Sequence, residues 1–358
     1  MVDPHQELKA VLSEHLSWHG ARIGFLAHFL LALLKVRSVN LAELATGFGG
    51  MAKVESHYKR LQRFFRAFEI DQDALARLLV RLVPVGDGPW RLTLDRTNWQ
   101  FGKTDINFLV LGVAHRGLAV PLFWSVLGKA GNSDTAERIA LMERFLKVFG
   151  GSRVAALLAD REFVGEAWFQ WLQHQGIPFH QRLKRDTRVP NSWNRMMRLD
   201  QLFGSLRPGG ARHLAGRRPV WGCFVHLSAL RLADGDFLFI ASSGAPQAEA
   251  LDAYADRWPV ETLFGALKSR GFNLEDTHLT DPKRLAKLMG LLALAFAWTY
   301  RTGELLHDGP SPIRQKKTLS RPLKSFFRHG LDFLRNAVLN VTEKTHEFIW
   351  ALRVLSCT

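Results

Sequence analysis

The order of its predicted elements constrains the fold of this chain more than any other feature. Between residues 90 and 184 three strand-like runs come first, and a helix, a strand, a helix and a last strand follow. This order is typical of an α/β fold on a mixed sheet. The predicted elements are strands Arg91 to Asp95, Phe108 to Ala114 and Leu118 to Leu127, a helix from Thr135 to Phe149, a strand from Val154 to Asp160, a helix from Gly165 to Gln175 and a strand from Phe179 to Lys184.

Two of these strands are predicted to end in a carboxylate, Asp95 and Asp160. The alternating run before Asp95 predicts a strand with one covered face, and the unbroken apolar run before Asp160 predicts a central strand covered on both faces. If the strands are parallel neighbours, the two aspartates emerge side by side at the edge where open α/β sheets bind ligands. An aspartate after a strand is more often a turn or cap residue, so the pair gains weight only with a third acid.

The third acid belongs to a spaced set of four polar residues, Tyr254, Arg257, Glu261 and Lys268, with offsets of 3, 7 and 14 from the tyrosine. In one continuous helix these offsets rotate to roughly 300°, 340° and 320°, which places all four side chains in one stripe. Any single pair in such a stripe is commonly just a solvated face. A metal-binding carboxylate beside two cations and a phenol, however, suits chemistry on a phosphodiester.

The same residues resemble the signature of the IS-four family of bacterial insertion-sequence transposases, which carries this Tyr-Arg-Glu-Lys tetrad. The resemblance extends to Trp258 and through most of the stretch from Gly271 to Thr280. Asp160 to Phe163 resembles the second-aspartate motif of that family, with Glu162 as a structural or outer acid. The resemblance covers residues 88 to 300 well and the remainder loosely.

The resemblance implies an RNase H-like core, a β-rich insertion, and cut-and-paste movement of DNA through a hairpin at the transposon end. It also implies roles for particular residues. The catalytic acids that hold two Mg²⁺ ions, with Mn²⁺ as a substitute, are expected to be Asp95, Asp160 and Glu261, and the residues that hold DNA phosphates are expected to be Tyr254, Arg257 and Lys268.

The helix that carries the tetrad has one weak point, at Pro259. We expect Asp256 to cap this helix and Pro259 to lie in its first turn. A helix that begins before Tyr254 would instead be bent at the proline. Trp258 has two interpretations, either a stacking surface for an unpaired hairpin base or a core aromatic behind the helix.

The first 85 residues are helical by pattern. A short helix from Asn40 to Ala45 and a turn from Gly47 to Gly50 precede an amphipathic helix from Lys53 to Phe68. This arrangement resembles a helix-turn-helix whose second helix meets DNA, although an ordinary surface helix fits as well. The basic face of that helix, predicted to bind end DNA, consists of Lys59, Arg63 and Arg66, and the opposite face of Leu61, Phe64, Phe65 and Phe68.

Charge favours a polyanionic partner, since 48 Lys and Arg against 33 Asp and Glu give a net charge of +15. Nucleic acid is the commonest such partner. The longest apolar runs are too short to span a bilayer, the start lacks the features of a signal peptide, and 2 cysteines provide no zinc or disulfide pattern. We therefore expect a cytoplasmic, nucleoid-associated protein. Sequence motifs for a nucleotide cofactor are missing.

Five segments are predicted for this α/β chain. They are a helical DNA-binding domain (1–88), the first part of an RNase H-like mixed-sheet core (89–185), a β-rich insertion (186–248) with strand-like runs at Val220 to Leu230 and Phe237 to Ser242, the second part of the core (249–301), and a basic helical C-terminal region (302–358). Within the last two, residues 285–301 are predicted to form a buried helix that ends at a breaker cluster from Gly303 to Pro312.

These features predict a DNA transposase that acts on double-stranded inverted-repeat ends and target DNA as a homodimer. Two rivals share the features. One is a metal-dependent nuclease on the same core that cuts without joining strands. The other is a transposase-derived DNA-binding protein that no longer catalyses, which an intact set of three acids disfavours because unpaired carboxylates repel one another.

Overall fold

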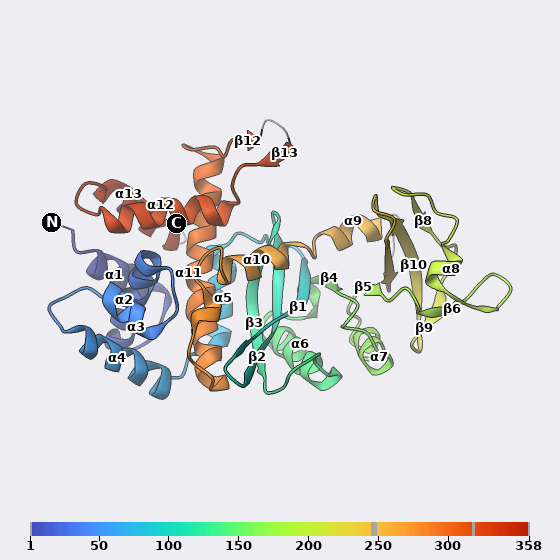
Figure 1. The fold of residues 1–358 in the computed structure, drawn as a ribbon, viewed down its shortest axis with the longest axis horizontal. Coiled ribbons are helices and arrows are strands. Elements are labelled where there is room, and N and C mark those ends of the chain that lie inside the picture. Colours follow the sequence, from blue (N-terminus) through green and yellow to red (C-terminus); the bar gives the residue numbers. More distant parts are fainter. Residues whose placement is uncertain (1, 245–248, 317–318, 357–358) are drawn as a thin grey trace. The chain divides into compact units, whose positions relative to one another are not determined.

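The computed structural model describes residues 2–244, 249–316 and 319–356. The chain divides into two compact units. The sheet unit comprises residues 85–98 and 107–262, and the helical unit comprises residues 1–84, 99–106 and 263–358. Figure 1 labels the elements of both.

A mixed sheet is the framework of the sheet unit. Its strands are β1 (Trp90–Phe101), β2 (Thr104–His115), β3 (Leu118–Leu127), β4 (Val154–Ala159), β5 (Phe179–Leu183), β8 (Ala211–His213), β9 (Arg218–Val220), β10 (Cys223–Arg231) and β11 (Phe237–Ser242). Within the described residues these nine strands follow the order β3-β2-β1-β4-β5-β11-β10-β8, with β9 paired to β10. The predicted mixed α/β class, with helices towards both ends of the chain, is confirmed (Figure 1).

The first and fourth strands are parallel neighbours, as predicted. Leu92 of β1 lies opposite Leu157 of β4, and Leu94 opposite Ala159. One detail of the prediction is wrong, because β1 does not end at Asp95 but continues to Phe101. The parallel pairing with β4 stops at Leu94, however, so Asp95 is the first residue beyond it.

The strands of the predicted insertion extend the central sheet. β11 pairs antiparallel with β5, and β10 pairs antiparallel with β11. The predicted strand from Val220 to Leu230 is divided at Trp221 and Gly222, both of which have positive φ angles (46° and 73°). Two further short strands, β6 (Arg188–Pro190) and β7 (Met196–Arg198), form a separate hairpin, and α8 (Leu199–Leu202) follows it.

Aromatic packing covers one part of the sheet with a helix. α6 (Thr135–Phe149) begins with a capping box, in which Asp134 and Glu137 each bond the backbone N–H of the other. Its Phe145 and Phe149 pack edge-on against Trp90 of β1. A short 3₁₀ turn (Gly151–Arg153) leads into β4, and α7 (Glu166–His174) connects β4 to β5.

The predicted continuous helix from Tyr254 to Lys268 is wrong. The chain forms α9 (Ala250–Ala255), a turn, and α10 (Pro259–Leu267). Pro259 is the cause, because its ring cannot continue a helix that began before it. Asp256 ends α9 rather than capping α10, and its carboxylate pairs with Arg91.

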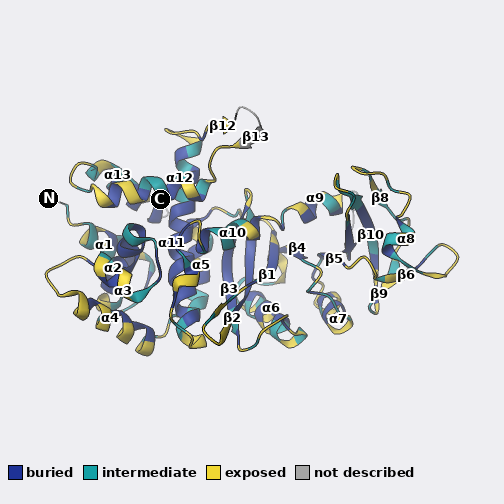
Figure 2. Cartoon of the chain, in the orientation of Figure 1, coloured by how far each residue is buried: buried dark blue, intermediate teal, exposed yellow. Residues whose placement is uncertain are grey.

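The helical unit combines the two ends of the chain. Before the sheet come α1 (Pro4–His15), α2 (Gly20–Val36), α3 (Leu41–Gly47), α4 (Val54–Ala67) and α5 (Gln72–Leu82), and after it come a 3₁₀ turn (Leu274–Asp276), α11 (Pro282–Asp308), β12 (Gln315–Lys316), β13 (Leu319–Pro322), α12 (Phe326–Leu339) and α13 (Thr345–Leu355). Figure 2 shows α2 and α11 as mostly buried. Gly47 is the last residue of α3 instead of belonging to the predicted turn. A Cβ there would lie 3.1 Å from the backbone of Ala32 on α2, so a glycine lets α3 approach α2 closely.

The buried helix was predicted to end at the breaker cluster that begins with Gly303, but Gly303 does not end it. α11 passes through Gly303 and ends at Asp308. A Cβ on Gly303 would clash with the backbone of Phe326, and one on Gly330 would clash with Thr299. These glycines therefore let α11 and α12 cross at very close range.

Among the described residues no single helix has the length and apolar composition needed to cross a membrane. The bent pair Gly20–Val36 and Leu41–Gly47 passes that test jointly, with a bend of 100° at the break.

Candidate active site

One face of the sheet carries the acidic residues. Side chains alternate along a strand, so Thr93 and Asp95 of β1 share a face. The register of β1 and β4 puts Thr93 opposite Leu158, which places Asp160, two residues after Leu158, on the same face. Asp95 and Asp160 thus lie at the carboxyl ends of adjacent parallel segments, where the sequence predicted them.

Asp95 is a partly buried carboxylate whose two oxygens are both engaged. Oδ1 accepts the backbone N–H of Arg96 at 2.7 Å, and Oδ2 accepts Nη1 of Arg257 at 2.7 Å. Burial raises the pKa of Asp95 above its ordinary value, Arg257 opposes this rise, and Asp160 adds to it. Asp160 is thus close enough to Asp95 for its negative charge to contribute to the raised pKa of Asp95.

Asp160 directly follows β4 and accepts the backbone N–H of Arg161 at 2.8 Å. Nη1 of Arg182, on β5, lies 3.5 Å from its Oδ1. Because Ala159 pairs with Gln181, alternation puts His180 and Arg182 on the acidic face. Arg182 was missed by the sequence analysis, because the register that pairs β5 with β4 is visible only in the structure.

Arg257 joins the third acid to the first. Its Nη2 donates to Oε1 of Glu261 at 3.0 Å, while its Nη1 donates to Asp95. The Arg257 side chain is 7% exposed and the Glu261 side chain 60% exposed. Burial alone lowers the pKa of Arg257, but Tyr254, Asp95 and Asp160 more than offset it, so the pKa is raised. The guanidinium is therefore a fixed positive charge among the acids.

Tyr254 lies beneath this cluster on α9. It is 1% exposed and packs with Leu238 and Ile240 of β11. Burial raises the pKa of its phenol, so the phenol is neutral. Within the described part of the chain, neither its hydroxyl nor that of buried Thr93 has a hydrogen-bond partner. Two buried hydroxyls thus remain available on the acidic face.

Trp258, in the turn between α9 and α10, is not a core residue. Its side chain is among the exposed large hydrophobic residues, at 46%. Its indole meets the ring of Tyr254 edge-on, with 6.3 Å between centroids. The core alternative for Trp258 is therefore wrong.

The boundary between the two units, which falls within α10, separates Lys268 from the rest of the tetrad. Tyr254, Arg257 and Glu261 belong to the sheet unit, whereas Lys268 follows α10 and belongs to the helical unit. There Lys268 pairs with Glu275 at 2.7 Å, and its ammonium lies 5.7 Å from the ring centroid of Trp99.

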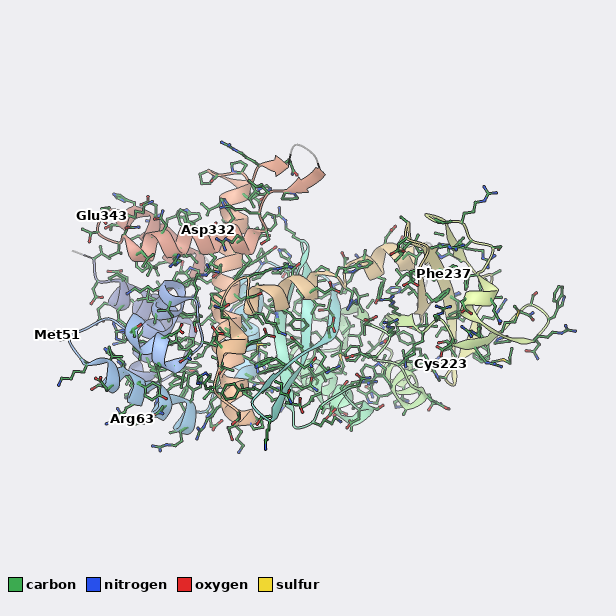
Figure 3. All side chains as sticks on the ribbon, in the orientation of Figure 1. Met51, Arg63, Cys223, Phe237, Asp332 and Glu343 are labelled. Atoms are coloured by element: carbon green, nitrogen blue, oxygen red, sulfur yellow. The ribbon has the colours of Figure 1, made fainter. Side chains whose placement is uncertain are left out.

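The other candidate residues lie on α4 and beside Asp160. Lys59, Arg63 and Arg66 are exposed on α4, and Leu61, Phe64 and Phe65 are buried, as predicted. Phe68 is only half-buried and follows the helix as its C-cap. Figure 3 labels Arg63, whose side chain projects from this helix. Glu162 accepts two N–H groups of Arg96, each at 3.1 Å, which agrees with a structural role.

The parallel β1–β4 pair places two aspartates where its pairing ends, at the carboxyl edge where open α/β sheets bind ligands, and Arg257 links a third acid to the first. The sequence identifies the family. The profile of the family described as transposase DDE domain matches residues 87–298, and the chain belongs to this family. Membership implies a DNA transposase with nuclease and transposition activity.

Two further comparisons add little. None of the curated proteins matches the chain. Among solved structures, the chain is similar to the piggyBac transposase in a cryo-EM synaptic complex with hairpin DNA, at 12% identity and a TM-score of 0.44, over 96% of this chain and 80% of that one. A similarity of this size carries no conclusion about the site.

Proposed function

We propose that this protein is a cut-and-paste transposase, which binds the inverted-repeat ends of its element, cleaves them through a DNA hairpin and joins them to target DNA. The observation that supports the chemistry is the placement of Asp95 and Asp160 on adjacent parallel strands, with Glu261 linked to Asp95 by Arg257. Family membership supports the substrate.

The donor chemistry of the acidic face fits a hard divalent cation. Transposases of this family generally use such ions, and carboxylate oxygens favour Mg²⁺ or Mn²⁺. The described side chains do not form a ready cluster of three metal-binding groups, since Arg257 stands between Asp95 and Glu261. We propose that Asp95, Asp160 and Glu261 hold two ions once Glu261, which is largely exposed, turns towards the aspartates.

Two bound ions would supply activation of the attacking oxygen and charge stabilisation of the phosphodiester. The chain itself positions the DNA. A guanidinium carries five donors, so Arg257 has donors left for a phosphate oxygen while it holds Asp95. The buried phenol of Tyr254 is a second donor, and the ammonium group of Lys268 is a third that we assign to phosphate binding.

Trp258 is proposed to receive a base that leaves the stack when the DNA end folds into a hairpin. Its exposure of 46% gives the base a surface to reach, and a base stacked on an aromatic ring gains roughly 1 to 3 kcal/mol. Arg257, the preceding residue, places a phosphate-binding group beside that surface.

We propose that residues 1–88 bind the end DNA through Lys59, Arg63 and Arg66, and that two copies of the chain pair in the synaptic complex. The net charge of +15 supports a DNA partner. The remaining predicted segments, 89–185, 186–248, 249–301 and 302–358, are retained as a proposed division of the chain.

The cations around the acids remove the argument against a non-catalytic DNA-binding protein. Self-repulsion of three carboxylates was the argument against it, but Arg257 and Arg182 compensate these charges in the structure. The acids would therefore be stable without catalysis, and only an assay separates the alternatives. The nuclease alternative predicts cleaved ends that never become joined.

The test is an incubation of the purified full-length protein with labelled DNA from both sides of its coding sequence, in Mg²⁺, with a target plasmid. The proposal predicts nicks at fixed positions, hairpin ends and labelled plasmid. Fixed nicks without labelled plasmid would support the nuclease, and binding without nicks would support the non-catalytic protein.

A further inference from the structure

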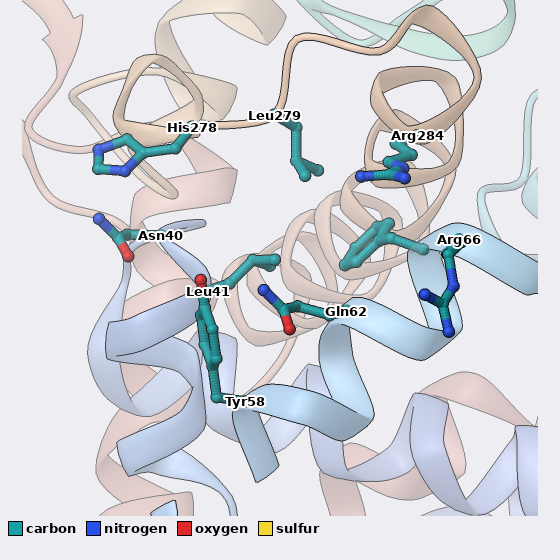
Figure 4. A pocket seen from close by; sticks show the side chains of 9 residues that line it. Asn40, Leu41, Tyr58, Gln62, Arg66, His278, Leu279 and Arg284 are labelled. Carbon is teal, nitrogen blue, oxygen red and sulfur yellow. The ribbon is translucent and has the colours of Figure 1, made fainter. Parts of the chain in front are cut away.

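A pocket in the helical unit lies outside the acidic face. Its volume is about 360 Å³, within the range of small-ligand sites. One wall consists of Tyr58, Gln62 and Arg66 of α4, and the other of His278, Leu279 and Arg284 (Figure 4). We call it the Tyr58 pocket. The second wall includes His278 and Leu279 from the stretch whose motif resemblance the acidic face did not explain.

Contacts between α11 and the end of α4 connect the two walls of the Tyr58 pocket. Lys287 of α11, one turn beyond Arg284, donates to the carbonyl of Phe65 at 3.2 Å and pairs with Glu69 at 3.0 Å. Lys287 is 5% exposed and Glu69 is 79% exposed, so the buried part of this link between α11 and the end of α4 is the bond to Phe65. The ring of His278 stacks on Phe101, with 4.8 Å between centroids. These contacts join both walls to neighbouring elements of the helical unit.

Its lining is rich in donors and poor in acids. Figure 4 shows Arg66 and Arg284 on opposite walls, and neither has an acidic partner among the described residues. The acids nearest in sequence are engaged, Asp281 with the backbone N–H of Arg284 at 2.9 Å and Glu69 with Lys287. Two guanidiniums that line one pocket without an acidic partner among the described residues favour an anion there.

The remaining groups suit a nucleotide rather than a bare anion. Asn40 uses its Oδ1 to cap α3, which leaves its amide nitrogen as a donor at one end of the pocket. Tyr58 adds an aromatic face and a hydroxyl, and Gln62 adds a carboxamide. Arginines for the phosphate, an aromatic ring for the base and carboxamides for base edges are the groups by which proteins hold a nucleotide.

We propose that the Tyr58 pocket holds one phosphodiester of a bound DNA strand between Arg66 and Arg284, with the adjoining nucleotide against Tyr58. This inference rests on the proposed function, since it takes DNA as the substrate. It gives Arg66, one of the three residues of the basic α4 face, a defined contact in the pocket. It also makes the segment from His278 to Arg284 a second DNA-binding element.

The test uses the full-length protein and the tightest-binding short duplex tiled from the DNA beside the coding sequence. Each backbone phosphate is replaced singly by a neutral methylphosphonate. At one phosphate position, the methylphosphonate should weaken DNA binding by the wild-type protein several-fold. The same methylphosphonate should not weaken DNA binding by Arg66→Gln or Arg284→Gln any further. The double variant should lose less than the product of the two single losses, because both arginines hold one phosphate.

Arg77→Gln is the matched control. Arg77 is exposed on α5 of the same unit, so this variant loses the same charge outside the pocket and should keep the wild-type profile. Equal melting temperatures check that all variants fold. A wild-type profile in Arg284→Gln would overturn the proposal, and so would failure of the wild-type protein to bind any duplex.

Free deoxyadenosine monophosphate tests the other source of a nucleotide. Binding of this mononucleotide that depends on Arg284, together with an unchanged duplex profile, would assign the pocket to a free nucleotide and overturn the proposal. The cleavage assay is independent. If Arg284→Gln cleaves normally in Mg²⁺ and each methylphosphonate affects its binding as in the wild type, only the pocket proposal is rejected. If one phosphate contributes to binding only when Arg284 is present, but the wild-type protein never cleaves DNA, only the transposase proposal is rejected.

Discussion

Arg257 connects the acids of the site at the scale of single residues. It holds Asp95 and Glu261 at hydrogen-bonding distance while being almost fully buried. Replacing it with alanine leaves Asp95 partly buried without its cation, and breaking a buried pair in this way typically costs 3 to 5 kcal/mol. We therefore expect Arg257→Ala to lower the free energy of unfolding by about 3 kcal/mol, with Arg257→Lys losing less.

Arg185→Ala is the control for Arg257, because Arg185 pairs with Asp200 but is 72% exposed. It should lose less than about 1 kcal/mol in the same denaturant titration. Among variants that still fold, Arg257→Lys should lose more in hairpin formation and joining than in binding of ends. Similar stability losses for Arg257→Ala and Arg185→Ala would contradict the buried link.

Trp258 gives a second prediction at this scale. Since its side chain is largely exposed, Trp258→Ala should change the free energy of unfolding by less than about 1 kcal/mol. On pre-nicked ends the same variant should form few hairpins. Trp193, which is 80% exposed, provides a matched tryptophan, and Trp193→Ala should retain hairpin yield. Normal hairpins in Trp258→Ala would remove the stacking role.

Among the elements, α4 carries the predicted contact with DNA. Its basic face is exposed and its apolar face is buried. A variant with Lys59, Arg63 and Arg66 all changed to Ala should bind end DNA with a log-log salt slope reduced by about 0.9 for each phosphate that these side chains no longer neutralise. Anisotropy titrations across a salt series measure this slope. The pair Arg77→Ala and Arg81→Ala on α5 is the control, and an unchanged slope in the triple variant would make the α4 face an ordinary surface.

The packing of α1 on α2 predicts a pH dependence. His28 of α2 stacks on His5, with 3.7 Å between centroids, and burial, followed by His5, Arg60 and His57, lowers the pKa of His28 to about 4. The unfolded chain therefore binds a proton between about pH 6.5 and pH 4 that the folded chain does not. Stability contributed by neutral His28 is present above this window and is lost as the pH falls through it.

His28→Phe keeps an aromatic ring at this position and removes the titration. The melting temperature of the wild-type protein should fall relative to that of this variant as the pH is lowered from 7 to 5. Because His28 is partly exposed, the corresponding change in the free energy of unfolding should be about 1 kcal/mol rather than the full value of the pKa shift. Parallel melting curves at all pH values would show that His28 does not contribute.

Local pattern predicted most elements of the fold. Apolar alternation located the strands and amphipathic spacing located α4, because these periods report which face is buried. Long-range effects were not predictable in this way. The crossing of Gly303 with Gly330 turned an apparent helix breaker into a packing contact, and the pairing of β11 with β5 joined the insertion to the central sheet.

For the molecule as a whole, the sequence spacing of the tetrad identified candidate site residues but did not predict how they are arranged in space. Tyr254, Arg257 and Glu261 do not lie on one helix, since Pro259 begins a new one. Arg257 still meets Glu261 because the turn between α9 and α10 keeps i to i+3 hydrogen bonds, from Val260 to Arg257 and from Glu261 to Trp258. Arg182 and Thr93 entered the site only through strand register, which a single sequence does not display.

The central claim is that Asp95, Asp160 and Glu261 together hold the metal ions for DNA cleavage. The most direct test is single-turnover cleavage of end DNA in Mg²⁺ by Asp95→Asn, Asp160→Asn and Glu261→Gln, with binding measured in parallel in Ca²⁺. Asp186→Asn, which removes an exposed carboxylate of the same unit, is the control. Each of the three variants should cleave at least about a hundredfold more slowly, because metal ions contribute several kcal/mol to the transition state, while DNA binding and the control stay at wild-type levels. Wild-type cleavage by any one of the three variants would contradict the account.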